Sequence, residues 1–125
     1  MCGIVGGITN KNIAPLLMDG LKRLEYRGYD SSGLVILSQD NKLVRERAAG
    51  KVSNLENNLK LKKPSLKGNV GLAHTRWATH GKPSVNNAHP HISKNSISLV
   101  HNGIIENYID LKDLQMKQGY AFTSE

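Results

Sequence analysis

The 125-residue sequence has a single cysteine, Cys2, and few aromatic residues. One thiol excludes an internal disulfide framework and any zinc site built from several cysteines. No apolar run approaches the roughly 18 residues that span a bilayer. The N-terminus also lacks the basic flank and the cleavage site of a signal peptide. These absences favour a reducing, cytoplasmic setting without a membrane partner.

Length and composition are those of one globular domain, with 38% hydrophobic and 22% charged residues. The net charge of +7 is concentrated in residues 42–67, which hold eight Lys or Arg against two Asp or Glu. Such a stretch could contact the phosphates of a nucleic acid. It contains no aromatic residue for base stacking, and its leucines follow the spacing of a solvated amphipathic helix. We therefore expect no nucleic-acid partner.

Hydrophobic spacing predicts a mixture of strands and helices. Residues 2–8 form an apolar run that predicts a buried strand, and residues 13–24 have helical periodicity with Asn12 as the expected N-cap. Residues 34–44 predict a hairpin with a polar turn. The remaining predicted elements are a helix over 52–59, a loop over 60–67, strands over 70–73 and 97–100, and an amphipathic helix over 105–119. Clustered strands favour antiparallel or mixed α+β layering over a doubly wound parallel sheet.

Cys2 lies one residue from the start of the chain, which gives it a possible catalytic role. If Met1 is removed, Cys2 carries a thiol and a free α-amine, whose usual pKa is about 7.7–8.0. Such an amine can serve as the general base for its own thiol, as in N-terminal nucleophiles. The alternative is that Cys2 is a small apolar residue that starts a buried strand.

The dipeptide Asn102-Gly103 directly follows a predicted strand. An Asn side-chain amide and the next backbone N–H form a suitable donor pair for an oxyanion. Asn-Gly is also a common tight-turn dipeptide, so a purely structural role stays open.

Residues 74–81 (HTRWATHG) combine basic, aromatic and hydroxyl side chains in a short space. Arg76 follows a predicted strand and could bind a carboxylate with both arms of its guanidinium, while Trp77 could form an apolar lid. The five histidines all fall between His74 and His101, which raises the possibility of a metal site. The segment has no carboxylate and no second cysteine, so we expect no metal and favour hydrogen-bonded structural histidines.

These motifs occur together, and in the same order, in one known family. They are MCGIVG (1–6), RLEYRGYDS (23–31), HTRWATHG (74–81), AHPH (88–91) and VHNGIIEN (100–107). The sequence closely resembles the N-terminal glutaminase domain of glutamine–fructose-6-phosphate aminotransferases, also called glucosamine-6-phosphate synthases. The start alone would indicate only a class II glutamine amidotransferase. The blocks at 24–31 and 74–81 separate it from relatives such as amidophosphoribosyltransferase and asparagine synthetase.

The resemblance implies a reaction and a set of site residues. Cys2 would attack the side-chain amide carbon of glutamine, releasing ammonia and then, through water, glutamate, with no cofactor. Asn102 and the Gly103 N–H would hold the oxyanion, and Arg76 would bind the substrate α-carboxylate. The implied catalytic residues are Cys2, Arg27, Asn102 and Gly103, and the implied glutamine-binding residues are Arg76, Trp77, Thr79 and His80.

The resemblance also implies the fold and the organisation of the protein. The expected fold is the four-layer αββα sandwich of the N-terminal-nucleophile hydrolases, here incomplete. Residues 1–125 would be the N-terminal portion of the glutaminase domain, without the sugar-isomerase domains that bind fructose 6-phosphate. The implied partners are glutamine and, for the parent enzyme only, fructose 6-phosphate and further copies of itself.

One departure from the family pattern concerns the end of the chain. The pattern continues Ser-Glu-Thr-Asp, and that Asp would pair with the α-ammonium group of glutamine. Because the sequence stops at Glu125 and includes Met1, we expect little or no glutaminase activity from these 125 residues alone. Two alternatives stay open: the glutaminase part of another class II amidotransferase, or an inactive module that only binds glutamine or another amino acid.

Overall fold

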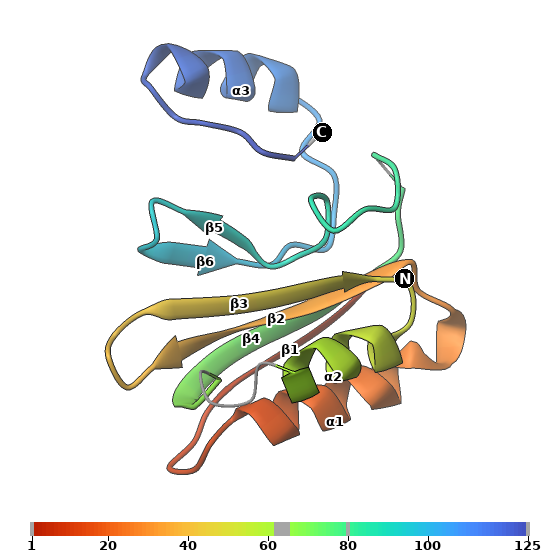
Figure 1. The fold of residues 1–125 in the computed structure, drawn as a ribbon. Helices are drawn as coiled ribbons and strands as arrows, with labels where there is room; N and C mark the ends of the chain where they lie inside the picture. Colours follow the sequence, from red (N-terminus) through yellow and green to blue (C-terminus); the bar gives the residue numbers. More distant parts are fainter. Residues whose placement is uncertain (1, 62–65, 80, 125) are drawn as a thin grey trace.

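The computed structural model describes residues 2–61, 66–79 and 81–124, without the side chain of Arg27. Its elements, in chain order, are β1 (Gly3–Ile8), α1 (Ala14–Leu24), the short 3-10 helix η1 (Glu25–Arg27), β2 (Ser31–Ser38), β3 (Leu43–Ala49), α2 (Val52–Leu61), β4 (Gly68–Arg76), β5 (His91–Ser93), β6 (Ile97–Leu99) and α3 (Tyr108–Lys117). Figure 1 shows them in four layers: α1 and α2, a sheet, the β5–β6 hairpin, and α3. The α+β prediction is confirmed.

An antiparallel sheet with strand order β1-β4-β2-β3 forms the centre of the molecule. Within it, Gly3 of β1 lies opposite Thr75 of β4, and Ser31 of β2 lies opposite Arg76. The starts of β1 and β2 therefore lie beside the end of β4, at one end of the sheet. This register brings Cys2, the residues before Ser31 and the residues after Arg76 to the same end of the sheet.

The hydrophobic core fills the space between this sheet and the α1–α2 layer. Ile13, the N-cap of α1, and Leu17 and Leu21 within the helix recur every four residues and are fully buried, because this spacing places them on one helix face. They pack with Leu34 and Ile36, which point from β2 to the same side as alternate residues of a strand do. The core thus packs the helix-facing side of the central strands β4 and β2 against α1 and α2.

Gly33 allows the loop before β5 to pack against the other face of the sheet. A Cβ atom at position 33 would lie 2.3 Å from the carbonyl oxygen of His89 and 2.8 Å from the Arg47 side chain. Only glycine therefore permits this close approach of the two layers. Arg47 fastens the same loop, since its Nη1 donates to the carbonyl of Ala88 at 2.7 Å.

Several sequence predictions need correction at this level. The N-cap of α1 is Ile13 and not Asn12, although Asn12 Oδ1 still accepts the Ala14 N–H at 3.4 Å. Strand β1 is only partly buried, because it lies at the sheet edge and leaves Ile8 exposed. Strand β5 was not predicted, and residues 60–61 belong to α2. Of the predicted loop, residues 62–65 lie outside the described part of the chain.

Candidate functional site

Cys2 lies immediately before β1, at the end of the sheet where β4 also ends. Its Sγ accepts a hydrogen bond from the Trp77 N–H at 3.2 Å and lies 3.6 Å from the Trp77 carbonyl oxygen. The Gly3 N–H donates to Thr75 Oγ1 at 3.2 Å, which fixes the residue that follows. Cys2 precedes β1 and Trp77 follows β4, and these two strands pair Gly3 with Thr75. The sheet register therefore determines where the sulfur lies.

Asn102 approaches Cys2 from the segment that follows β6. Its Nδ2 donates to the Cys2 carbonyl oxygen at 3.1 Å, and its Oδ1 lies 2.7 Å from Nε2 of His74. The next residue, Gly103, has a backbone φ of +157°. A side chain there would lie only 2.8 Å from the His101 ring. The backbone after Asn102 thus follows a path that requires glycine.

Arg76 is buried at the end of β4, and its guanidinium is held by the surrounding loops. Nη1 lies 3.5 Å from Asp30 Oδ1, and Nη2 donates to the Gly81 carbonyl at 3.3 Å. Asp30 also accepts a hydrogen bond from the Ala78 N–H. One carboxylate thus contacts both neighbours of Trp77, Arg76 and Ala78. The result is a fixed cationic group beside Cys2, which suits a substrate carboxylate.

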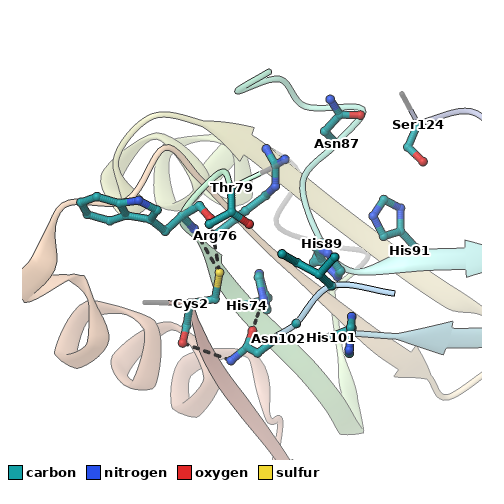
Figure 2. Close-up of a pocket in the computed structure, with 13 residues that line it drawn as sticks. Cys2, His74, Arg76, Thr79, Asn87, His89, His91, His101, Asn102 and Ser124 are labelled. Carbon is teal, nitrogen blue, oxygen red and sulfur yellow. Dashed lines mark hydrogen bonds between the residues drawn. The ribbon is translucent and has the colours of Figure 1, made fainter. Parts of the chain in front are cut away.

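A cavity of about 400 Å³ brings these groups together, as Figure 2 shows for the residues it labels. This volume lies within the usual range of small-molecule sites. Its lining residues are Cys2, His74, Arg76, Trp77, Thr79, Asn87, His89, His91, His101, Asn102, Gly103, Ile104 and Ser124. Six of the eight site residues named from the sequence are among them. Of the other two, His80 and the side chain of Arg27 lie outside what the structure describes.

The cavity has a second group of lining residues that were not assigned to the site from the sequence. His74 and His89 have ring centroids 4.4 Å apart, and His89 and His91 form an edge contact at 4.5 Å. Arg45 Nη1 donates to the Pro90 carbonyl at 3.2 Å, which helps to place this loop. The sequence feature that could have indicated this second group is the clustering of all five histidines between residues 74 and 101.

The expectation that the histidines are fully hydrogen-bonded is wrong for two ring atoms. Within the described residues, the buried Nδ1 atoms of His74 and His89 have no hydrogen-bond partner. Burial lowers the pKa of His74, and burial together with neighbouring cationic groups lowers the pKa of His89 to about 3 and that of His91 to about 4. These three imidazoles are therefore neutral near pH 7, and the guanidinium of Arg76 supplies a positive charge in the cavity.

We expect the stability of the fold to decrease as the pH falls from 7 to 5.5. The folded pKa values of His89 and His91 lie below the ordinary value of 6.5, so the unfolded chain binds protons that the folded chain does not. Each such group lowers the free energy of unfolding by up to about 1.4 kcal/mol per pH unit below that value. Neighbouring basic groups also oppose protonation of the two histidines: Arg76 and His101 act on His89, and Arg45, Arg47 and Arg76 act on His91.

Urea unfolding at pH 7.0, 6.25 and 5.5 measures this effect above the range where most carboxylates titrate. The urea midpoint should fall over this range, and His89→Gln should reduce the slope. A midpoint that stays constant or rises on acidification would contradict the assignment of neutral histidines.

Among the described residues, no group of three or more His, Cys, Asp or Glu side chains is arranged to hold a metal ion. In the same residues, no helix has the length and apolar character needed to cross a bilayer.

Comparison with known proteins supplies close relatives for the whole chain. It is 58% identical over all 125 residues to a glutamine–fructose-6-phosphate aminotransferase (isomerizing) of Acinetobacter baylyi. The chain covers 20% of that protein, so it spans about a fifth of the length of the curated relatives it matches. No family model matches the chain.

Two solved structures of amidotransferase type are also similar to the chain. A structure described as the allosteric regulatory enzyme of purine biosynthesis aligns with 98% of the chain and 27% of its own, with a TM-score of 0.75 and 29% identity. The glutamine phosphoribosylpyrophosphate amidotransferase of B. subtilis aligns with 97% of the chain and 25% of its own, with a TM-score of 0.67 and 29% identity. The chain thus has the fold of a class II, N-terminal-nucleophile glutamine amidotransferase domain, in part, and matches the N-terminal glutaminase part of the glutamine–fructose-6-phosphate aminotransferases.

Proposed function

We propose that this site hydrolyses glutamine to glutamate and ammonia, with Cys2 as the nucleophile. The observation that supports this most directly is the placement of the only thiol, an amide donor and a buried guanidinium on one cavity. Cys2, Asn102 and Arg76 come from three separate segments, yet the sheet and its loops bring them together. A module that only binds an amino acid needs no thiol at this point.

The reaction begins once Met1 has been removed and the α-amine of Cys2 is free. The amine takes the thiol proton, and sulfur forms a bond to the side-chain amide carbon of glutamine. The carbon–nitrogen bond then breaks, and the nitrogen takes a proton and leaves as ammonia. Water attacks the resulting γ-glutamyl thioester, the carbon–sulfur bond breaks, and glutamate leaves with the thiol restored.

Asn102 and the Gly103 N–H serve as the oxyanion donors in both steps. The side-chain amide of an Asn carries two N–H groups, and one of them donates to the Cys2 carbonyl. The second N–H stays available for the oxygen of the tetrahedral intermediate. The charge on that oxygen develops only during the reaction. Such donors therefore stabilise the transition state more than they stabilise bound glutamine.

The remaining residues on this side of the cavity bind the substrate. Arg76 holds the α-carboxylate of glutamine, and Thr79 and His80 complete that side. Trp77 covers bound glutamine, and Arg27 supports the surroundings of the nucleophile. These roles are carried over from the family resemblance. Arg76, Trp77 and Thr79 line the cavity, which supports the proposal for these three residues.

We further propose that residues 1–125 form the N-terminal portion of a larger amidotransferase domain. None of the residues of α3 is buried, and Ile109 and Leu114 on that helix are more than half exposed. An exposed apolar surface of this kind usually packs against further structure. In the parent protein, other domains would use the ammonia to convert fructose 6-phosphate to glucosamine 6-phosphate. We place that protein in the reducing cytoplasm, as an oligomer of identical chains, without nucleic-acid or membrane partners.

The proposal is tested by mass spectrometry with an electrophilic glutamine analogue, on the protein at its full natural length. We expect a mass that lacks Met1 and a single adduct on Cys2, which excess glutamine prevents. The same sample should release glutamate and ammonia from glutamine. Retained Met1, or an adduct that glutamine does not prevent, would count against a nucleophile in a glutamine pocket.

A further inference from the structure

We propose that His74 is a positioning residue that fixes the orientation of the Asn102 side-chain amide. The inference rests on the proposed glutamine hydrolysis, and it adds a residue that does not itself touch the reacting atoms of the substrate. It starts from the 2.7 Å contact between His74 Nε2 and Asn102 Oδ1, which is shorter than most N–H···O hydrogen bonds.

The donors and acceptors around Asn102 determine which way its amide faces. The Cys2 carbonyl oxygen can only accept a hydrogen bond, so the amide atom 3.1 Å from it is the NH₂ group. The amide oxygen then faces His74, and an oxygen requires a donor there. His74 must therefore carry its proton on Nε2.

The imidazole of His74 is well fixed for this task. His74 is 1% exposed and lies within β4, opposite Ile4 of β1 on one side and Gly33 of β2 on the other. Its ring packs against that of His89, with the centroids 4.4 Å apart and the ring planes tilted by 33°. A residue in the interior of a sheet has little freedom to move, so the donor stays in one place.

The state of Nδ1 agrees with this tautomer. Among the described residues, Nδ1 of His74 is buried without a partner, as expected for the ring nitrogen that carries no proton. Arg76, Asp30, His89, His101 and Asn102 are the charged, titratable and polar groups that face the ring. Burial is the largest effect on its pKa and lowers it, so the imidazole stays neutral with one N–H, on Nε2.

Fixing the amide matters because its two ends have opposite effects on an oxyanion. In the observed orientation, the NH₂ group lies on the Cys2 side and can donate to the developing charge. If the amide rotated by 180°, its oxygen would face both the Cys2 carbonyl and the oxyanion, and both contacts would be repulsive. A donor that is already oriented needs no rearrangement during the reaction. His74 thus acts on the transition state through Asn102.

Two variants of His74 that differ by one methylene group test this idea in the full-length protein. The amide of a glutamine at position 74 can reach the place of Nε2, whereas the amide of an asparagine reaches only the place of Nδ1. We expect His74→Asn to lower kcat for glutamine hydrolysis about 10- to 100-fold with KM nearly unchanged. The loss should be smaller than that from removing the oxyanion donor itself, which is about 10²- to 10³-fold. We expect His74→Gln to keep most of the wild-type kcat.

A double-mutant cycle separates positioning from packing. In an Asn102→Ala background, His74→Asn should have no further effect on kcat, because the group that it positions is already gone. Equal losses in His74→Asn and His74→Gln, or losses that multiply in the Asn102→Ala background, would overturn the inference. Thermal unfolding of each variant identifies any loss of folded protein, and kcat is calculated per folded molecule.

The same set of proteins tells the two proposals apart. A wild-type protein that does not hydrolyse glutamine would refute the proposed function. A wild-type protein that hydrolyses glutamine and is impaired by Asn102→Ala, but not by His74→Asn, would leave the function standing and refute the role of His74.

Discussion

In the full-length protein, replacement of Cys2 by alanine is expected to abolish glutamine hydrolysis, with a decrease in kcat on the order of 10⁶-fold. The chain has no other thiol, and the described side chains of the cavity include no alternative nucleophile next to a free amine. Binding should persist, because Arg76 and Asn102 keep their own partners at the end of β4 and beside His74. Steady-state release of ammonia measures the first effect, and calorimetric titration with glutamine measures the second.

The matched control for this experiment is Cys2→Ser, which keeps a hydrogen-bonding atom at the position of Sγ. We expect it to bind glutamine as the wild type does and to hydrolyse it far more slowly, since a hydroxyl is a weaker nucleophile than a thiolate. If Cys2→Ala retained hydrolysis, a different nucleophile would be at work. If the wild-type protein bound glutamine without hydrolysing it, the site would be one that only holds an amino acid.

The second large effect is expected for Asn102→Asp. This change keeps the shape of the side chain and the oxygen that accepts from His74, but it replaces the NH₂ donor beside Cys2 with a carboxylate oxygen. Loss of one oxyanion donor lowers kcat by about 10²- to 10³-fold, and the added negative charge acts in the same direction. We expect at least this decrease in kcat, with a much smaller change in KM.

Asn57→Asp supplies the control, because it makes the same chemical change at an exposed position of α2, on the other side of the sheet. Its kinetic constants should equal those of the wild type. A kcat for Asn102→Asp within a few-fold of the wild-type value would mean that Asn102 only forms a turn. The tight-turn interpretation of Asn102-Gly103 would then be the correct one.

Most of the fold can be predicted from the sequence, because its strongest signals are periodic. The leucines of α1 recur at helical spacing, and the apolar runs on either side of residues 39–41 flank a polar turn, so the sequence alone places both elements. The hairpin strand β5 could not be predicted from the sequence, because His91 and Ser93 are polar and the strand is short. Its position depends on pairing with β6 and on the arginines of β3.

The composition of the site could be anticipated only in part. Cys2, Arg76 and Asn102 were recognisable because each chemistry needs a particular residue type at a strand end. The role of His74 was not recognisable, because a histidine inside a strand has the same sequence pattern whether or not it contacts Asn102. That contact joins residues 28 positions apart, and only the three-dimensional structure shows it.

The sheet order also has a consequence for the biosynthesis of the protein. Among the residues that the structure describes, β1 pairs only with β4, so Gly3 lacks this strand partner until Thr75 has been made. At about 5–20 residues per second, ribosomes need several seconds to add that length of chain. During this interval the N-terminus is an unpaired strand that a processing enzyme can reach. Removal of Met1, which the proposed reaction requires, can therefore precede the closure of the sheet around Cys2.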